Sequence, residues 1–122
     1  MGEQPQPVTE ECFGAQIKEA LGLSALRYTP ASCMVRTVAV VGGAGGEYVG
    51  AAADCGADAF VTGEVRHHEA VEARMRGLAL YEAGHYHTEV VYRQMRCAAL
   101  AERCPGVRLR VSKSERPPAE FL

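Results

Sequence analysis

The sequence lacks the cysteine patterns of small disulfide-bonded domains and zinc ribbons. Its five cysteines are an odd number, and no two of them have the CxxC spacing. An odd number of cysteines without a CxxC pair argues against a disulfide framework and against a zinc ribbon. We therefore interpret the cysteines as small, buried, apolar residues of a protein in a reducing compartment.

Long apolar runs and an excess of positive charge are also missing. No apolar stretch reaches the roughly 20 residues of a membrane-spanning helix, and the polar segment 1–9, with two prolines, is unlike a signal peptide. The net charge of -2 does not indicate nucleic-acid binding. We expect a cytoplasmic protein without a membrane partner.

What remains is an ordinary globular composition of 122 residues, of which 48% are hydrophobic. A chain of this length buries enough surface to fold as one domain. We predict a flexible lead-in over residues 1–8, a single α/β domain over 9–112 and a tail over 113–122.

Apolar periodicity predicts an alternation of helices and strands. Helices are expected at 10–21, 48–55, 70–75 and 85–104, and strands at 26–28, 36–41, 57–62, 78–81 and 107–111. Thr9 is the expected N-cap of the first helix, and Gly22 its C-cap. This order predicts a three-layer α/β sandwich, in which helices cover a mainly parallel or mixed sheet.

Three loops that follow predicted strands carry unusual residues. They are the glycine run 42–46, the pair Gly63–Glu64 and the pair Gly84–His85. Ligands of parallel sheets bind beyond the carboxyl ends of the strands. We therefore expect these loops to meet at one edge of the sheet and to form a site.

The glycine run has two interpretations. Backbone N–H groups of Gly42, Gly43, Gly45 and Gly46 could bind phosphate or another anion at the start of the next helix. The same glycines could simply allow a tight turn with positive φ. The run matches neither the GxGxxG nor the P-loop pattern, so spacing alone leaves both interpretations open.

The segment 63–69 concentrates two histidines, two glutamates and one arginine. Glu64 and His68 are four residues apart and would share a face of a helical turn, where they could bind a metal or transfer a proton. A charged, solvated helix start is the simpler interpretation, and the residues alone favour it.

His85 and Glu89 form the sharper pair. Their i, i+4 spacing at the start of a helix places an imidazole beside a carboxylate, which suits zinc, iron, manganese or nickel. A capped helix with an exposed glutamate is the equal alternative. His87 lies between them and should point elsewhere. Two ligands do not complete a metal site, so further donors would come from Glu64, His68 or another chain.

These motifs together resemble a known family. A strand ending in GGAGG, the block GADAFVTGEVRHHEA and the block GHYHTE follow in order, and the chain resembles the carboxy-terminal part of Nif-three-like (NGG-one-interacting factor three) proteins. The resemblance implies a dinuclear metal protein that forms toroidal hexamers, with some members labelled GTP cyclohydrolase I type 2. It implies that His85 and Glu89 are metal ligands, with His68 and Gly42–Gly46 beside the site.

Two departures from the family pattern matter. Glu64 replaces the family's aspartate, with a side chain one methylene longer, and the paired histidines and the aspartate of the family's amino-terminal half do not occur here. We expect a metal-binding protein, either a cyclohydrolase-like hydrolase in which Glu64 or His68 moves protons, or a non-enzymatic module. In either case a homo-oligomer or a partner chain would supply the missing ligands. A nucleotide-binding module that uses the glycine loop is a third hypothesis.

Overall fold

The computed structural model describes residues 1–119 and contains one mixed sheet of five strands. The strands lie in the order β1-β3-β4-β5-β2. Their bounds are Gly2–Thr9 for β1, Arg27–Thr29 for β2, Met34–Val41 for β3, Ala59–Thr62 for β4 and Ala79–Glu82 for β5. The central strands β3, β4 and β5 are parallel, whereas β1 and β2 pair antiparallel at the two edges.

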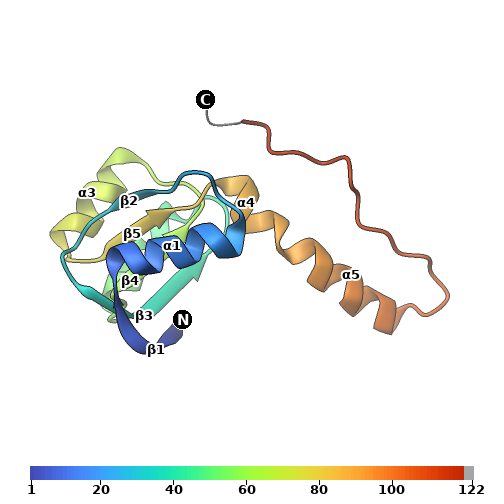
Figure 1. The fold of residues 1–122 in the computed structure, drawn as a ribbon, viewed down its shortest axis with the longest axis horizontal. Helices are drawn as coiled ribbons and strands as arrows, with labels where there is room; N and C mark the ends of the chain where they lie inside the picture. The colour runs from blue at the N-terminus through green and yellow to red at the C-terminus, as the bar shows by residue number, and fades with distance from the viewer. Residues whose placement is uncertain (120–122) are drawn as a thin grey trace.

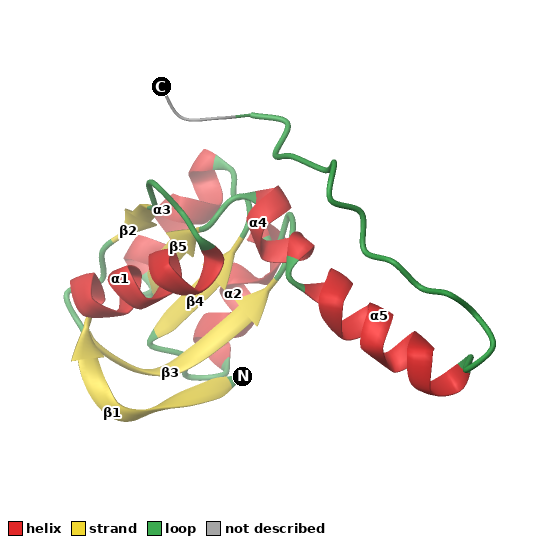
Figure 2. Ribbon diagram, turned by 45° about the vertical axis from the view of Figure 1, so that its right-hand side comes forward, coloured by secondary structure: helices red, strands yellow, loops and turns green. Residues whose placement is uncertain are grey.

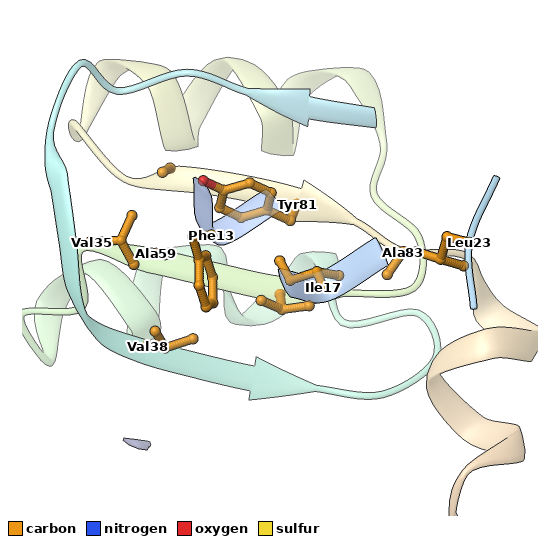
Figure 3. Packing of buried hydrophobic residues seen from close by; sticks show 10 residues of the cluster. Phe13, Ile17, Leu23, Val35, Val38, Ala59, Tyr81 and Ala83 are labelled. Carbon is orange, nitrogen blue, oxygen red and sulfur yellow. The ribbon is translucent and has the colours of Figure 1, made fainter. Parts of the chain in front are cut away.

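Helices cover both faces of this sheet, so the predicted three-layer sandwich is confirmed (Figures 1 and 2). Helix α1 (Glu10–Leu21) packs Phe13 and Ile17 onto one face, where they meet Val38, Val61 and Tyr81 (Figure 3). On the other face, α2 (Val49–Asp54) and α3 (His67–Met75) enclose a second core around Phe60. Successive strand residues supply opposite faces because side chains alternate along a strand.

The first helix has the predicted ends. The Thr9 side chain accepts a hydrogen bond from the N–H of Cys12, and Gly22 ends the helix in the left-handed conformation with φ of 64°. In the first turn, buried Glu10 accepts hydrogen bonds from the N–H groups of Ala31 and Cys33, each at 3.0 Å. One carboxylate thus joins α1 to the loop before β3.

The prediction of a loose lead-in over residues 1–8 is wrong. Residues Gly2–Thr9 form the edge strand β1, which pairs with β3 at both of its ends. Between Glu3 and Val8 the register shifts, and Pro5 and Pro7 occupy this irregular stretch. Proline cannot donate to a strand ladder and is confined to edges and bulges, so a proline-containing segment can still be an edge strand.

The carboxy-terminal third also differs from expectation. The single helix predicted over 85–104 is two helices, α4 (His85–Val90) and α5 (Tyr92–Arg103), and the strand predicted over 107–111 does not form. Helix α5 projects from the body, and the following segment runs back beside it (Figures 1 and 2). Without a sheet edge within reach, the β-branched residues of 107–111 have no strand to pair with.

The cysteines are less buried than predicted. Cys12 and Cys55 are exposed, and the other three are partly exposed; all five are free thiols. Burial and the nearby Glu10 carboxylate raise the pKa of the Cys33 thiol. None of the helices within residues 1–119 is long and apolar enough to cross a membrane.

Candidate functional site

The three loops singled out from the sequence meet at the carboxyl ends of β3, β4 and β5. The N–H of Gly63 donates to the carbonyl of Gly43 at 2.9 Å, and the N–H of Gly84 donates to the carbonyl of Gly63 at 3.0 Å. These bonds join the loops in the order of their parallel strands. The predicted convergence is confirmed.

His85 lies between two carboxylates at this edge. Its Nδ1 is 3.2 Å from Oε2 of Glu64, and its Nε2 is 3.4 Å from Oε1 of Glu89. Glu89 shares the helix face of His85, as the spacing predicts, whereas Glu64 arrives from the loop after β4. All three side chains are about half exposed to solvent.

The backbone approaches these side chains closely at two glycines. A Cβ on Gly43, which has φ of 70°, would lie 2.7 Å from Oε1 of Glu89 and 3.2 Å from Nε2 of His85. A Cβ on Gly63 would lie 2.8 Å from the Cα of His85. Real Cβ atoms essentially never approach another atom within 3.0 Å, so glycine at both positions makes room for the His85–Glu89 pair.

Two threonines that the sequence reading did not single out fix the loops. The Thr88 hydroxyl accepts from the N–H of Gly43 at 3.0 Å, and the Thr62 hydroxyl accepts from the N–H of Gly45 at 3.0 Å. Thr88 stands three residues after His85, on the same face of α4, and this spacing in the sequence could have identified it as a neighbour of the site. Thr62 ends β4 immediately before Gly63.

These bonds bear on the role of the glycine loop. The N–H groups of Gly43 and Gly45 are directed to threonine hydroxyls, and Gly45 also donates to the carbonyl of Gly43. Two of the N–H groups proposed for an anion are therefore already bonded within the protein. These internal hydrogen bonds account for the tight turn of the loop. Binding of a cofactor by Gly42, Gly43, Gly45 and Gly46 stays a prediction.

The surroundings of His85 favour its protonated form. The hydrogen bond to Glu64 is the largest effect and raises the pKa of His85 above the ordinary 6.5. Desolvation, the next largest effect, lowers this pKa, and the negative charges of Glu89 and Glu64 raise it. Both carboxylates thus hold the imidazole at this edge of the sheet.

His68 lies apart from this group. Its side chain is 71% exposed, and its Nε2 is 4.0 Å from Oε1 of Glu69. The expectation that Glu64 and His68 share a helical face is wrong, because Arg66 is extended, with ψ of 160°, and α3 begins only at His67. Glu64 therefore precedes the helix.

A cavity of about 460 Å³ adjoins the site. It is lined by Gly46, Glu47, Glu64, Arg66 and Glu69, among others. Glu69 is buried and accepts a hydrogen bond from the N–H of Arg66, and a Cβ on Gly46 would overlap its carboxylate. Glu64 thus lines the cavity and also contacts His85, whereas His85 and Glu89 do not line the cavity themselves.

The donors at this edge suit part of a metal site. Two bonds of about 2.1 Å at a tetrahedral angle separate their donor atoms by about 3.4 Å, which matches the distance of 3.4 Å between Nε2 of His85 and Oε1 of Glu89. Within residues 1–119, however, no group of three or more His, Cys, Asp or Glu side chains is arranged to hold an ion. The pair fits a divalent ion only with additional donors.

Comparisons with a family model and with known sequences agree on one protein family. The model of the Duf34/NIF3 (NGG1p interacting factor 3) family matches residues 1–118. A Staphylococcus aureus protein named "GTP cyclohydrolase 1 type 2 homolog" is 37% identical over 87 residues, and a Staphylococcus epidermidis protein of the same name is 33% identical. Each match covers 70% of this chain but 24% of the relative, so the matched residues span about a quarter of the length of these proteins.

Solved structures agree with this comparison. A Bacillus cereus protein related to NIF3 superimposes with a TM-score of 0.90 at 30% identity, over 99% of this chain and 35% of its own. A Staphylococcus aureus protein superimposes with a TM-score of 0.88 at 28% identity, over 98% of this chain and 40% of its own.

Proposed function

The chain belongs to the Duf34/NIF3 family, and from this premise we propose that it binds a divalent metal ion between Nε2 of His85 and Oε1 of Glu89. The observation that carries the proposal is the distance of 3.4 Å between these two atoms. Imidazole and carboxylate together suit zinc, iron, manganese or nickel. Other donors, from water or from another chain, would complete the coordination.

Glu64 supports this assignment from the other side of the ring. Histidine ligands of metals commonly donate their second ring N–H to a carboxylate, which fixes the tautomer and the ring orientation. Glu64 Oε2 stands 3.2 Å from Nδ1 of His85, in the position for this role. A proton held on Nδ1 leaves the lone pair on Nε2, the nitrogen that faces Glu89.

The proposed reaction is hydrolysis of a ring compound, of the kind that the relatives' name denotes. A bound divalent ion would act as a Lewis acid and would make water a stronger nucleophile. The chain's own contribution would be the cavity, as the place for the substrate, and the Glu64 carboxylate, which lines this cavity and contacts His85. Glu64 would accept the proton that water loses when it attacks a ring carbon, and would return it to the ring nitrogen whose bond to that carbon breaks.

A second candidate function is a non-enzymatic module that assembles with itself or with a partner. The observation that favours it is the donor count, because two side chains are too few for a stable metal site. On this reading His85 and Glu89 contribute to a site shared with another chain. Turnover separates the two functions: zinc-loaded chain that opens the ring of GTP, followed by chromatography, supports the hydrolase, and retained zinc without turnover supports the module.

Calorimetric titration of the purified chain with Zn²⁺ tests the metal proposal itself. We expect heat of binding from the unaltered chain and none from the double variant His85→Ala/Glu89→Ala, with unchanged circular dichroism. The matched control is His68→Ala/Glu72→Ala, which removes the same residue types at the same spacing from α3 and should bind zinc normally. Equal zinc binding by His85→Ala/Glu89→Ala would refute the proposal.

A further inference from the structure

Helix α5 and the segment that runs back beside it enclose a second cavity, of about 260 Å³ (Figures 1 and 2). None of the residues that line this cavity belongs to the site around His85. Cavities that bind drug-sized molecules usually measure about 300–1,000 Å³. The size of this cavity therefore suits a smaller molecule.

One face of α5 forms the first wall of the cavity. This face carries Arg93, Arg96, Cys97 and Leu100, which follow one another at intervals of three, one and three. Such spacing places side chains on one side of a helix. Helix α5 therefore presents basic and apolar groups to the same space.

The return segment forms the second wall with the same combination of groups. Leu109 and Val111 line the cavity and are partly buried, whereas Arg110 and Ser112 line it and are exposed. The apolar side chains thus lie toward the interior of the cavity and the polar side chains toward its opening. Successive residues of an extended segment point to opposite sides, which accounts for this alternation.

Two of the three arginines of the cavity have no acidic partner. Arg93 forms an ion pair with Glu115 and donates to the carbonyl of Val90 at 3.2 Å. The ion pairs found within residues 1–119 include neither Arg96 nor Arg110. Residues 91–119 contain seven Lys or Arg but two Asp or Glu, so few carboxylates compete for these arginines. Their guanidinium groups are available to a ligand.

We propose that this cavity binds a small amphipathic anion, in which a phosphate or carboxylate group is joined to a short aliphatic chain. Arg96 and Arg110 would bind the oxyanion, because a guanidinium group donates two parallel N–H bonds to such a group. The aliphatic chain would cover Leu109 and Val111. An apolar pocket with a few polar groups that fix orientation is the usual form of a small-molecule site.

The lining favours this ligand over nucleic acid and over a bare anion. No aromatic side chain lines the cavity, whereas proteins that bind single strands stack the bases on aromatic rings. A bare phosphate would satisfy the arginines but would leave Leu109 and Val111 in contact with water. An aliphatic chain removes this apolar surface from water, which is favourable.

Calorimetric titration of the full chain with hexyl phosphate and with inorganic phosphate tests the inference. We expect hexyl phosphate to bind at least about tenfold more tightly, because each buried methylene group contributes roughly a fourfold factor in affinity. Arg96→Gln/Arg110→Gln should weaken binding of hexyl phosphate by about tenfold or more, with unchanged circular dichroism. The matched control is Arg103→Gln/Arg108→Gln, which removes one arginine from each of the same two segments but none that lines the cavity.

The thiol of Cys97 provides a second readout, which locates the ligand. Cys97 lines the cavity and is partly exposed, whereas Cys12 and Cys55 are exposed elsewhere in the chain. Hexyl phosphate at ten times its Kd should slow alkylation of Cys97 by iodoacetamide about tenfold, because the occupied cavity excludes the reagent. Alkylation of Cys12 and Cys55 should keep its rate, and mass spectrometry of peptides measures all three.

Three outcomes would overturn the proposal: equal affinities for hexyl phosphate and inorganic phosphate, undiminished binding by Arg96→Gln/Arg110→Gln, or unprotected Cys97. Binding of phosphatidylglycerol vesicles or of single-stranded DNA in place of hexyl phosphate would assign the arginines to a membrane or to nucleic acid, and would overturn it as well. Neither readout involves a metal or a residue of the His85 site, so the outcome is independent of the proposed function.

Discussion

Gly43 and Glu89 approach each other so closely that a Cβ on the glycine would lie 2.7 Å from the Oε1 atom of the carboxylate. The two residues are far apart in sequence, and the parallel strands β3 and β5 bring the loops that follow them to the same edge of the sheet. Glycine at position 43 therefore leaves the space that the Glu89 side chain of helix α4 occupies.

Gly43→Ala should weaken zinc binding by about tenfold or more, because the added methyl displaces Glu89 and His85. It should also cost about 1–2 kcal/mol in the free energy of unfolding, because φ is 70°. Gly77→Ala is the matched control, since Gly77 has φ of 68° and no neighbour within 4 Å. Zinc titration and urea unfolding of both variants measure the difference; equal zinc affinities would contradict the expectation.

Glu64→Gln should lower the pKa of His85 toward 6.5, because the hydrogen bond to the carboxylate is the largest cause of its raised value. A histidine pKa raised by folding stabilises the folded protein fully below the ordinary pKa, and this stabilisation is lost as pH rises through the raised value. Nuclear magnetic resonance of the metal-free chain measures the pKa directly. Glu47→Gln, which does not contact His85, should leave it unchanged.

Thr88→Val should detach the glycine loop from α4. Valine keeps the shape of threonine but leaves the buried N–H of Gly43 without its acceptor, which costs about 1–3 kcal/mol. Thr88→Ser retains the hydroxyl and should preserve most of the stability. Urea unfolding compares the two variants, and equal losses in both would show that the hydroxyl is not what stabilises the loop.

Glu10→Ala should destabilise the fold by about 3 kcal/mol, because two partly buried N–H groups lose their acceptor. Glu11→Ala removes the neighbouring, exposed glutamate and should change the free energy of unfolding by about 0.5 kcal/mol or less. Thermal and urea unfolding measure both variants. A small effect of Glu10→Ala would mean that water replaces the carboxylate at Ala31 and Cys33.

Local sequence patterns predicted the elements whose causes are themselves local. The cap residues Thr9 and Gly22 set the ends of α1, and the apolar runs of β3 and β4 identified the buried centre of the sheet. The spacing of His85 and Glu89 placed them on one helix face because a helix fixes the neighbours of each residue. For the same reason the alternation of strands and helices was enough to predict where the loops meet.

Only the tertiary structure decided which residues from different segments come together. Glu64 reaches His85 rather than His68 because α3 begins after an extended Arg66, and Thr62 and Thr88 acquire their roles from loops that approach through space. The edge strand β1 and the unpaired segment 107–111 likewise depended on whether a sheet edge was available. Strand pairing, loop contacts and burial join distant residues, and no pattern within a short stretch of sequence encodes that proximity.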